Sequence, residues 1–324
     1  MRSHTVLISL LIACGSNDKA PIDAASDAPP DALVDADLGM PTGTHHHYVI
    51  DRQNVPANNT QARMYGLDLN GDQTVDNQLG MVLATFSGMG FNTQTSATTS
   101  VDTGRTILLA DLQATDLTTA THAGFTIYFG QNPQPAPCTG PSDTVCRHHL
   151  TGTGTFDVAA SPHDAALRGD LVNGTFTAGP GHLSIQLAMF AASSPVRIDL
   201  IGARVRLTNI TGTSIGTGVL AGAVTQSDLN TKIIPALQQS MVPVIARDCT
   251  MLASPPACGC ANGSQGENLL GLLDTSPKDC AVTVSEIQNN ALFQSLLAPD
   301  VTIDGQMALS LGIGITATGA TFTP

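Results

Sequence analysis

Strict alternation of apolar and polar residues in the middle of the chain most limits the folds open to it. In the stretch HLSIQL, Leu183, Ile185 and Leu187 recur at every second position, with Ser184 and Gln186 between them. The stretches GFTIYFG (124–130), VRIDL (196–200) and ARVRL (203–207) repeat the pattern. A period of two with one polar face indicates antiparallel strands. We therefore expect a mainly β protein, built as an antiparallel β-sandwich or as a strongly curved sheet.

Helical patterns flank this region. The apolar residues of DNQLGMVLATFSG (76–88) fall at helical spacing, with Asp76 or Asn77 as the expected N-cap. A smaller helical C-terminal part should begin near residue 225, with Ser227 as its N-cap and Pro235 as a kink. The expected division is a lipoprotein signal peptide at 1–13, a disordered tether at 14–43, a β-rich domain at 44–224 and a helical, disulfide-stapled part at 225–324.

The N-terminal segment indicates export. A short apolar run ends in LIAC (11–14), too short to span a bilayer, which takes about 20 apolar residues. The motif resembles the lipobox of bacterial lipoproteins, which implies acylation of Cys14 as the mature N-terminus and a stable membrane anchor. Gly15 after the cysteine implies the outer membrane, with the protein periplasmic or surface-exposed. An ordinary signal followed by a free cysteine is the alternative. The Asp-, Ala- and Pro-rich stretch that follows predicts an extended, solvated tether.

The remaining cysteines fit an exported, disulfide-bonded protein, because an even number is left once Cys14 is set aside. They are Cys138, Cys146, Cys249, Cys258, Cys260 and Cys280. Cys138 and Cys146 bracket a Gly/Pro turn and should pair. The last four allow three pairings; we expect Cys258 and Cys260 each to pair outward, one with Cys249 and the other with Cys280. A zinc site built from those four lacks the usual paired CxxC spacing.

One acidic stretch, GLDLNGDQTVDNQLG (66–80), predicts a calcium loop. Its candidate ligands are Asp68, Asn70, Asp72, Thr74 and Asp76. Short oxygen-bearing side chains at alternate positions of a turn suit calcium, and the run resembles loops of EF-hand, dockerin and thrombospondin type 3 proteins. Gln73 stands where an EF-hand prefers Gly, and Leu79 where it has a bidentate Glu. We therefore expect weak affinity, about 10⁻⁴–10⁻³ M. The alternative is an ion-free turn that caps a helix.

A second stretch, from Asp274 to Glu286, resembles an EF-hand loop that has lost its metal. Asp274, Ser276 and Glu286 approximate three ligand positions, but Glu286 comes one residue late and Lys278 replaces an acid. Apolar runs before and after it predict an entering and an exiting helix.

No motif of a known catalytic centre occurs, and no pair of carboxylates is placed for acid–base chemistry. The histidine clusters at 45–47 and 148–149 could hold a transition metal, but such clusters are more often polar surface. A net charge of −13 argues against nucleic acid as a partner.

The whole layout resembles uncharacterised bacterial surface lipoproteins, a resemblance that implies fold and place rather than substrate. We expect a non-enzymatic, calcium-stabilised lipoprotein that is anchored to the membrane through Cys14 and binds an unknown surface ligand or protein, or supports the envelope. The alternatives are an extracytoplasmic hydrolase with a loop-built site and a carbohydrate-binding module. The absence of Trp disfavours the carbohydrate module.

Overall fold

The computed structural model describes residues 39–324 except 89–90, 92, 189–194, 253–257 and 276–277. The expected signal peptide, the expected lipidation site Cys14, most of the expected tether, and Ser276 of the second loop lie outside the described residues. No helix within the described ranges is long and apolar enough to cross a membrane.

Strands dominate the described chain. They are β1 (Thr44–Asn54), β2 (Leu108–Ala114), β3 (Ala120–Gln134), β4 (Gly154–Val158), β5 (Leu167–Val172), β6 (Thr175–Ala178), β7 (Leu183–Leu187), β8 (Val196–Thr211), β9 (Ser214–Thr225), β10 (Cys249–Met251), β11 (Cys258–Cys260), β12 (Val301–Ile303) and β13 (Gln306–Thr321). All of them except the β10–β11 hairpin belong to one sheet of 11 strands. The predicted mainly β, antiparallel architecture is confirmed.

Most of the helices of the described chain lie in its second half. They are α1 (Asn59–Met64), α2 (Gln78–Gly88), α3 (Thr93–Asp102), α4 (Gln226–Asp228), α5 (Ile234–Asp248), α6 (Gln265–Leu273), α7 (Val284–Asn289) and α8 (Ala291–Leu296), with a 3₁₀ turn η1 (His148–Leu150) and a π-helical turn η2 (Leu229–Ile233).

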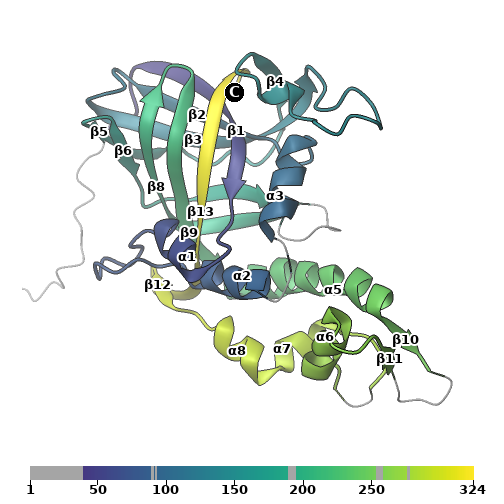
Figure 1. Ribbon diagram of the computed structural model, residues 1–324. Coiled ribbons are helices and arrows are strands. Elements are labelled where there is room, and N and C mark those ends of the chain that lie inside the picture. The colour runs from purple at the N-terminus through teal and green to yellow at the C-terminus, as the bar shows by residue number, and fades with distance from the viewer. Residues whose placement is uncertain (1–38, 89–90, 92, 189–194, 253–257, 276–277) are drawn as a thin grey trace, which may run out of the picture. The chain divides into compact units, whose positions relative to one another are not determined.

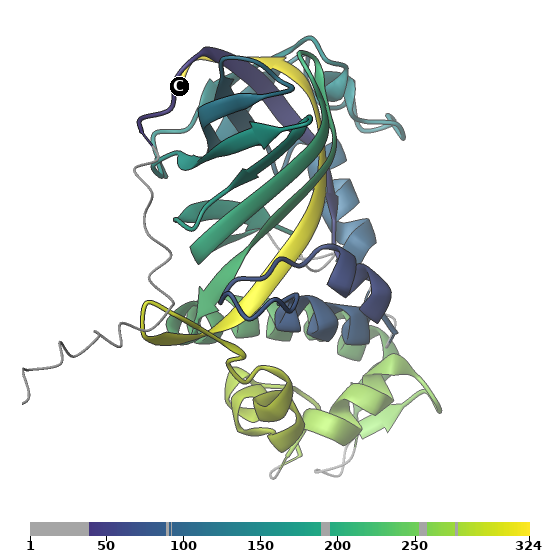
Figure 2. The ribbon, with the colours of Figure 1, turned by 90° about the vertical axis from the view of Figure 1, so that its left-hand side faces the viewer.

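The sheet curves until it closes on itself. Antiparallel pairing runs through β1, β2, β3, β5, β6, β8, β9 and β13, and β13 pairs back onto β1. In Figure 1, β13 runs between β1 and β9, and Figure 2 shows the strong tilt of the strands. A closed sheet of about eight strands has an interior that side chains just fill. Tyr48, Phe125 and Phe176 are fully buried there, so this interior is a packed core.

The helices extend the same core. Leu79, Val82, Leu83 and Phe86 of α2 are buried, as the helical spacing predicts, and they belong to one apolar cluster with the strand interior and with residues of α5 to α8. Both views place α2 and α5 across one end of the strand ring (Figures 1 and 2). On the outer face of β1, α3 covers a separate small cluster that includes Val49 and Leu109.

The C-terminal part differs in two ways from the sequence-based expectation. Thr225, rather than Ser227, caps the helical segment, because β9 runs directly into α4 and Thr225 is the last extended residue, accepting from Asp228 N. The chain also returns to the sheet after α8. Strand β13 is buried along most of its length, so it lacks the alternation that marks a strand with one polar face. Pro235 was expected as a kink, but it stands in the first turn of α5, directly after the π-helical turn, where a proline is tolerated; Pro243 is the proline inside α5.

The disulfides match the predicted scheme. Cys138 pairs with Cys146, and Cys258 and Cys260 both pair outward. The structure resolves which goes where: Cys249 bonds Cys260 across the β10–β11 hairpin, and Cys258 bonds Cys280.

Asn77 joins α1, α2 and β13. Its amide oxygen caps α2 by accepting from Gly80 N and also accepts from Gly312 N, and its amide nitrogen donates to Ala62 O and Gly312 O. Gly312 lies two residues beyond the last β1 partner, so Asn77 satisfies backbone groups that β1 no longer reaches. A Cβ on Gly312 would lie 2.0 Å from Tyr65 O, so only glycine fits this approach.

We predict that Asn77→Ala lowers the free energy of unfolding by about 3 kcal/mol. The substitution removes a helix cap and leaves buried backbone groups of Ala62 and Gly312 without hydrogen-bond partners. The matched control is Asn58→Ala, which removes only the exposed cap of α1 and should cost about 1 kcal/mol. Urea unfolding compares the two variants; equal losses would contradict the joining role of Asn77.

Candidate functional site

The predicted calcium loop is a tight turn closed by its own side chains. Asp68 accepts from Gly71 N at 2.7 Å and from Gln73 N at 2.9 Å, and Asp76 accepts from Leu69 N at 2.8 Å. Gln73, at the position where an EF-hand prefers Gly, adopts φ 68°. The backbone thus makes the sharp left-handed turn that such loops need, although the residue is not glycine.

The carboxylates of this loop do not converge on one point. In the described chain, only one set of three His, Cys, Asp or Glu side chains has ligand atoms within 4.8 Å of one another, and it contains none of Asp68, Asp72 and Asp76. Their oxygens instead accept from loop N–H groups; those of Asp72 also accept from the side chains of Asn70 and Thr74. Calcium binding here stays a prediction, and it would require these carboxylates to turn.

The electrostatics of the loop still favour a cation. Burial raises the pKa of Asp76, and the negative charges of Asp72, Asp300 and Asp68 raise it further. The hydrogen bond from Leu69 N lowers the pKa of Asp76, but by less than these effects raise it. A raised folded-state pKa means that ionised Asp76 disfavours the fold at neutral pH and that this cost falls as pH drops. Asp300 accepts from Ser310 N and Ser310 Oγ.

The second loop uses its acids as caps. Glu286 accepts from the backbone and side chain of both Thr275 and Thr283, forming the capping box of α7. Asp274 is buried and accepts from Asp279 N and Cys280 N. The entering helix is α6, and the exiting segment is split into α7 and α8.

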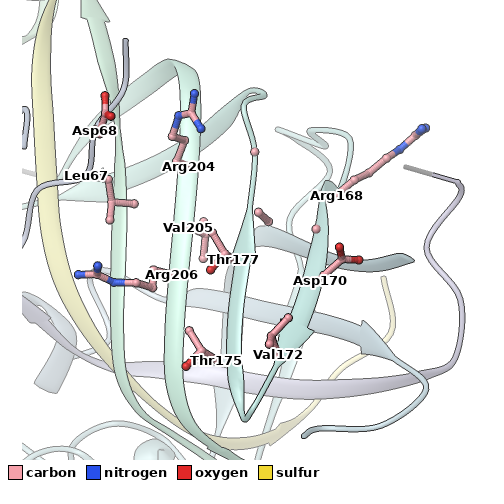
Figure 3. Close-up of a pocket in the computed structure, with 13 residues that line it drawn as sticks. Leu67, Asp68, Arg168, Asp170, Val172, Thr175, Thr177, Arg204, Val205 and Arg206 are labelled. Carbon is pink, nitrogen blue, oxygen red and sulfur yellow. The ribbon is translucent and has the colours of Figure 1, made fainter. Parts of the chain in front are cut away.

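The described chain has a groove of about 570 Å³ on the outer face of β5, β6 and β8. Leu67 and Asp68 of the acidic loop line it beside the strands. Figure 3 shows Arg204 and Arg206 on β8, with the Leu67–Asp68 segment on one side and Arg168 and Asp170 of β5 on the other.

Strand register sets the order of side chains in this groove. Asp170 pairs with Thr177, and Thr177 with Arg206, which puts an acid, a hydroxyl and a guanidinium in one row. Gly179, with φ 105°, lies against Ala203 O and Arg204 Cα, where a Cβ would clash. The outward alternation of Arg204 and Arg206 was visible in the sequence, but the neighbouring strands were not.

The histidines noted in the sequence have separate surroundings. His148 Nε2 contacts Asp143 at 2.9 Å, while His149 is buried against Phe156, and burial lowers its pKa to about 4. His45 and His47 lie on the outer face of β1, opposite Asp111 of β2.

No protein-family model, curated protein or solved structure matches this chain.

We predict that calcium raises the thermal midpoint of the full-length protein by a few degrees, since an ion at ten times its dissociation constant adds about 1.4 kcal/mol. Magnesium should do less, because it demands a tighter octahedral shell. Asp72→Ala should abolish the shift. Asp116→Ala is the matched control: Asp116 accepts from Thr118 N and Thr119 N in an exposed turn far along the chain, and its loss should leave the calcium shift intact. Equal wild-type midpoints in calcium and in chelator would leave the loop as a plain helix-capping turn.

Proposed function

We propose that this protein is a non-enzymatic, calcium-stabilised lipoprotein of the bacterial envelope that binds an acidic ligand in the groove on β5, β6 and β8. The proposal rests on the lack of ion-pair partners for Arg204 and Arg206, which line the groove. Neither has an ion-pair partner within 4.0 Å in the described chain. Arg147, Arg197, Arg247 and Lys232 each contact an aspartate. Arg52, Arg63 and Arg105 also lack an ion pair in the described chain, but they are not part of the groove lining.

Arg204 is the better anchor of the two. Its Nε is buried and has no hydrogen-bond partner among the described residues. A buried donor without an acceptor is costly, and a ligand carboxylate would satisfy it. Because a guanidinium offers a planar fork of donors, two arginines on one strand suit an extended ligand with successive carboxylates. The side chains of Thr175 and Thr177 line the floor and supply hydroxyl groups.

Catalysis fits this groove less well. Two carboxylates line it, Asp68 and Asp170, but they lie on opposite sides of strand β8 (Figure 3). Both are engaged with backbone N–H groups, Asp68 within its loop and Asp170 with His122 N at 3.1 Å. A hydrolase of the glycosidase type needs two carboxylates that flank one bond, with at least one free to exchange a proton. Binding is therefore the function that this geometry supports best.

The acidic loop would couple calcium to the groove. Asp68 both lines the groove and occupies the first ligand position of the predicted calcium loop. An ion on that loop would neutralise a carboxylate that repels an acidic ligand beside Arg204.

We predict that Arg204→Gln and Arg206→Gln each weaken binding of a fluorescent oligo-glutamate peptide about three- to tenfold, or roughly 0.7–1.4 kcal/mol. Fluorescence anisotropy with the full-length protein measures this, and raising the salt concentration should weaken binding further. The matched control is Arg105→Gln, which removes the same charge from an exposed residue after α3 that is not part of the groove lining. Equal loss in all three variants would indicate attraction by overall charge and reject the groove.

The calcium arm of the same experiment tests the coupling. Calcium should tighten peptide binding in the wild type but not in Asp72→Ala, and by linkage the peptide should tighten calcium binding equally. If peptide binding depends on Arg204 but does not change with calcium, the groove is the binding site and the proposed coupling to the calcium loop is rejected.

The anchor is tested separately, because Cys14 lies outside the described residues. We predict that cells expressing the wild type incorporate a fatty-acid analogue into the protein and that Cys14→Ala abolishes the label. Ser16→Ala, which leaves the LIAC motif intact, is the matched control. Equal labelling of Cys14→Ala and wild type would exclude acylation at this cysteine.

A further inference from the structure

The outer face of β1 and β2 brings two histidines and an aspartate together. His45 and His47 are two residues apart on β1 and therefore face the same way, and Asp111 is the β2 partner directly opposite His47. His45 Nδ1 lies 2.8 Å from Asp111 Oδ2, and His47 Nε2 lies 3.8 Å from Asp111 Oδ1. These three are the set, within the described ranges, whose ligand atoms all fall within 4.8 Å of one another.

Two atoms of this cluster are buried without a hydrogen-bond partner in the described chain. They are His47 Nε2 and Asp111 Oδ1. The Asp111 side chain is only 5% exposed, so solvent gives little compensation. Their separation of 3.8 Å is too long for a hydrogen bond but short enough for both atoms to contact one ion. Unpartnered buried polar atoms are uncommon, and a facing pair of them indicates a ligand between them.

We propose that His45, His47 and Asp111 bind a divalent transition-metal ion of the zinc type. Zinc takes imidazole nitrogen and carboxylate oxygen at about 2.0–2.2 Å, so tetrahedral neighbours lie ~3.4 Å apart. The two separations, 2.8 Å to Asp111 Oδ2 and 3.8 Å to Asp111 Oδ1, lie on either side of that spacing, so small rotations of the His45 and Asp111 side chains would complete the set. Calcium and magnesium prefer all-oxygen shells and would not select two imidazoles.

The surroundings hold part of the site rigid and leave part of it open. The ring of His47 stacks on Phe322 with centroids 4.3 Å apart, and Tyr128 meets Phe322 edge-on. The His45 side chain is half exposed. His47 and Asp111 would therefore form a fixed pair, His45 would close over the ion, and the fourth position would face solvent for water or an outside ligand.

The strand geometry distinguishes the proposed site from non-specific metal binding by three consecutive histidines. His46, between the two ligands, points to the opposite face of β1, where its β2 partner is Leu112 of the interior core. A flexible run of three histidines would use all of them alike, whereas the proposed site uses the outer two and excludes the middle one.

The test is isothermal titration of zinc into the full-length protein, produced without a histidine tag and with calcium present throughout to occupy the acidic loop. The expected result is one zinc per chain, bound at least about tenfold more weakly by His45→Ala and by Asp111→Asn. Zinc should also raise the thermal midpoint of the wild type but not of these variants. His45 is half exposed and its replacement should leave the fold intact, while circular dichroism checks the buried Asp111→Asn variant.

His46→Ala is the matched control and should bind zinc like the wild type. If His46→Ala loses as much affinity as His45→Ala, the binding is adventitious chelation by the histidine run, and the site is rejected. Unchanged affinity in both His45→Ala and Asp111→Asn would reject it equally.

Discussion

The fold depends on the pairing of its last strand. Strand β13 fills the space between β9 and β1, so that residues separated by more than 250 positions, such as Tyr48 and Gly319, become neighbours. Until β13 is in place, β1 and β9 lack their shared partner and the apolar interior stays open to water. Closure of the sheet buries that interior, so a ligand can bind the strands only on their outer face.

The outer face is shaped by the segment between β1 and α2. The acidic loop, with Leu67 and Leu69, covers the outward residues Val219 and Ala221 of β9, while Asn77 ties the following helix to the backbone of β13. One short stretch thus packs on the sheet, starts a helix and forms one wall of the arginine groove. Because Asp68 of this stretch lines the groove, a change in the charge of the stretch would alter the electrostatics of the groove directly.

The sequence predicted the parts of the fold that repeat locally. Alternation identified β3, β7 and β8, helical spacing and a capping side chain identified α2, and the spacing of Cys258 and Cys260 indicated that each pairs outward. It did not reveal β13, because Ala308 to Ile315 are buried on both sides and show no polar face. Both candidate ligand sites were predicted only in part: the histidines at 45–47 and the outward Arg204 and Arg206 were visible in the sequence, but their neighbours on other strands were not. The row Asp170–Thr177–Arg206 and the pair His47–Asp111 exist only through strand register, which no local pattern encodes.

Closure of the sheet also bears on how the protein would behave at high local density. The edge of an open sheet offers unpaired N–H and C=O groups to any neighbouring copy, and many proteins guard such edges with charged side chains, lysine above all. A ring of strands has no such edge along its circuit. Charged residues make up only 12% of this chain, below the roughly 25% common in soluble domains. Because its strand ring closes, this protein needs few charged side chains to guard its strands, and copies can come close together without joining strand to strand.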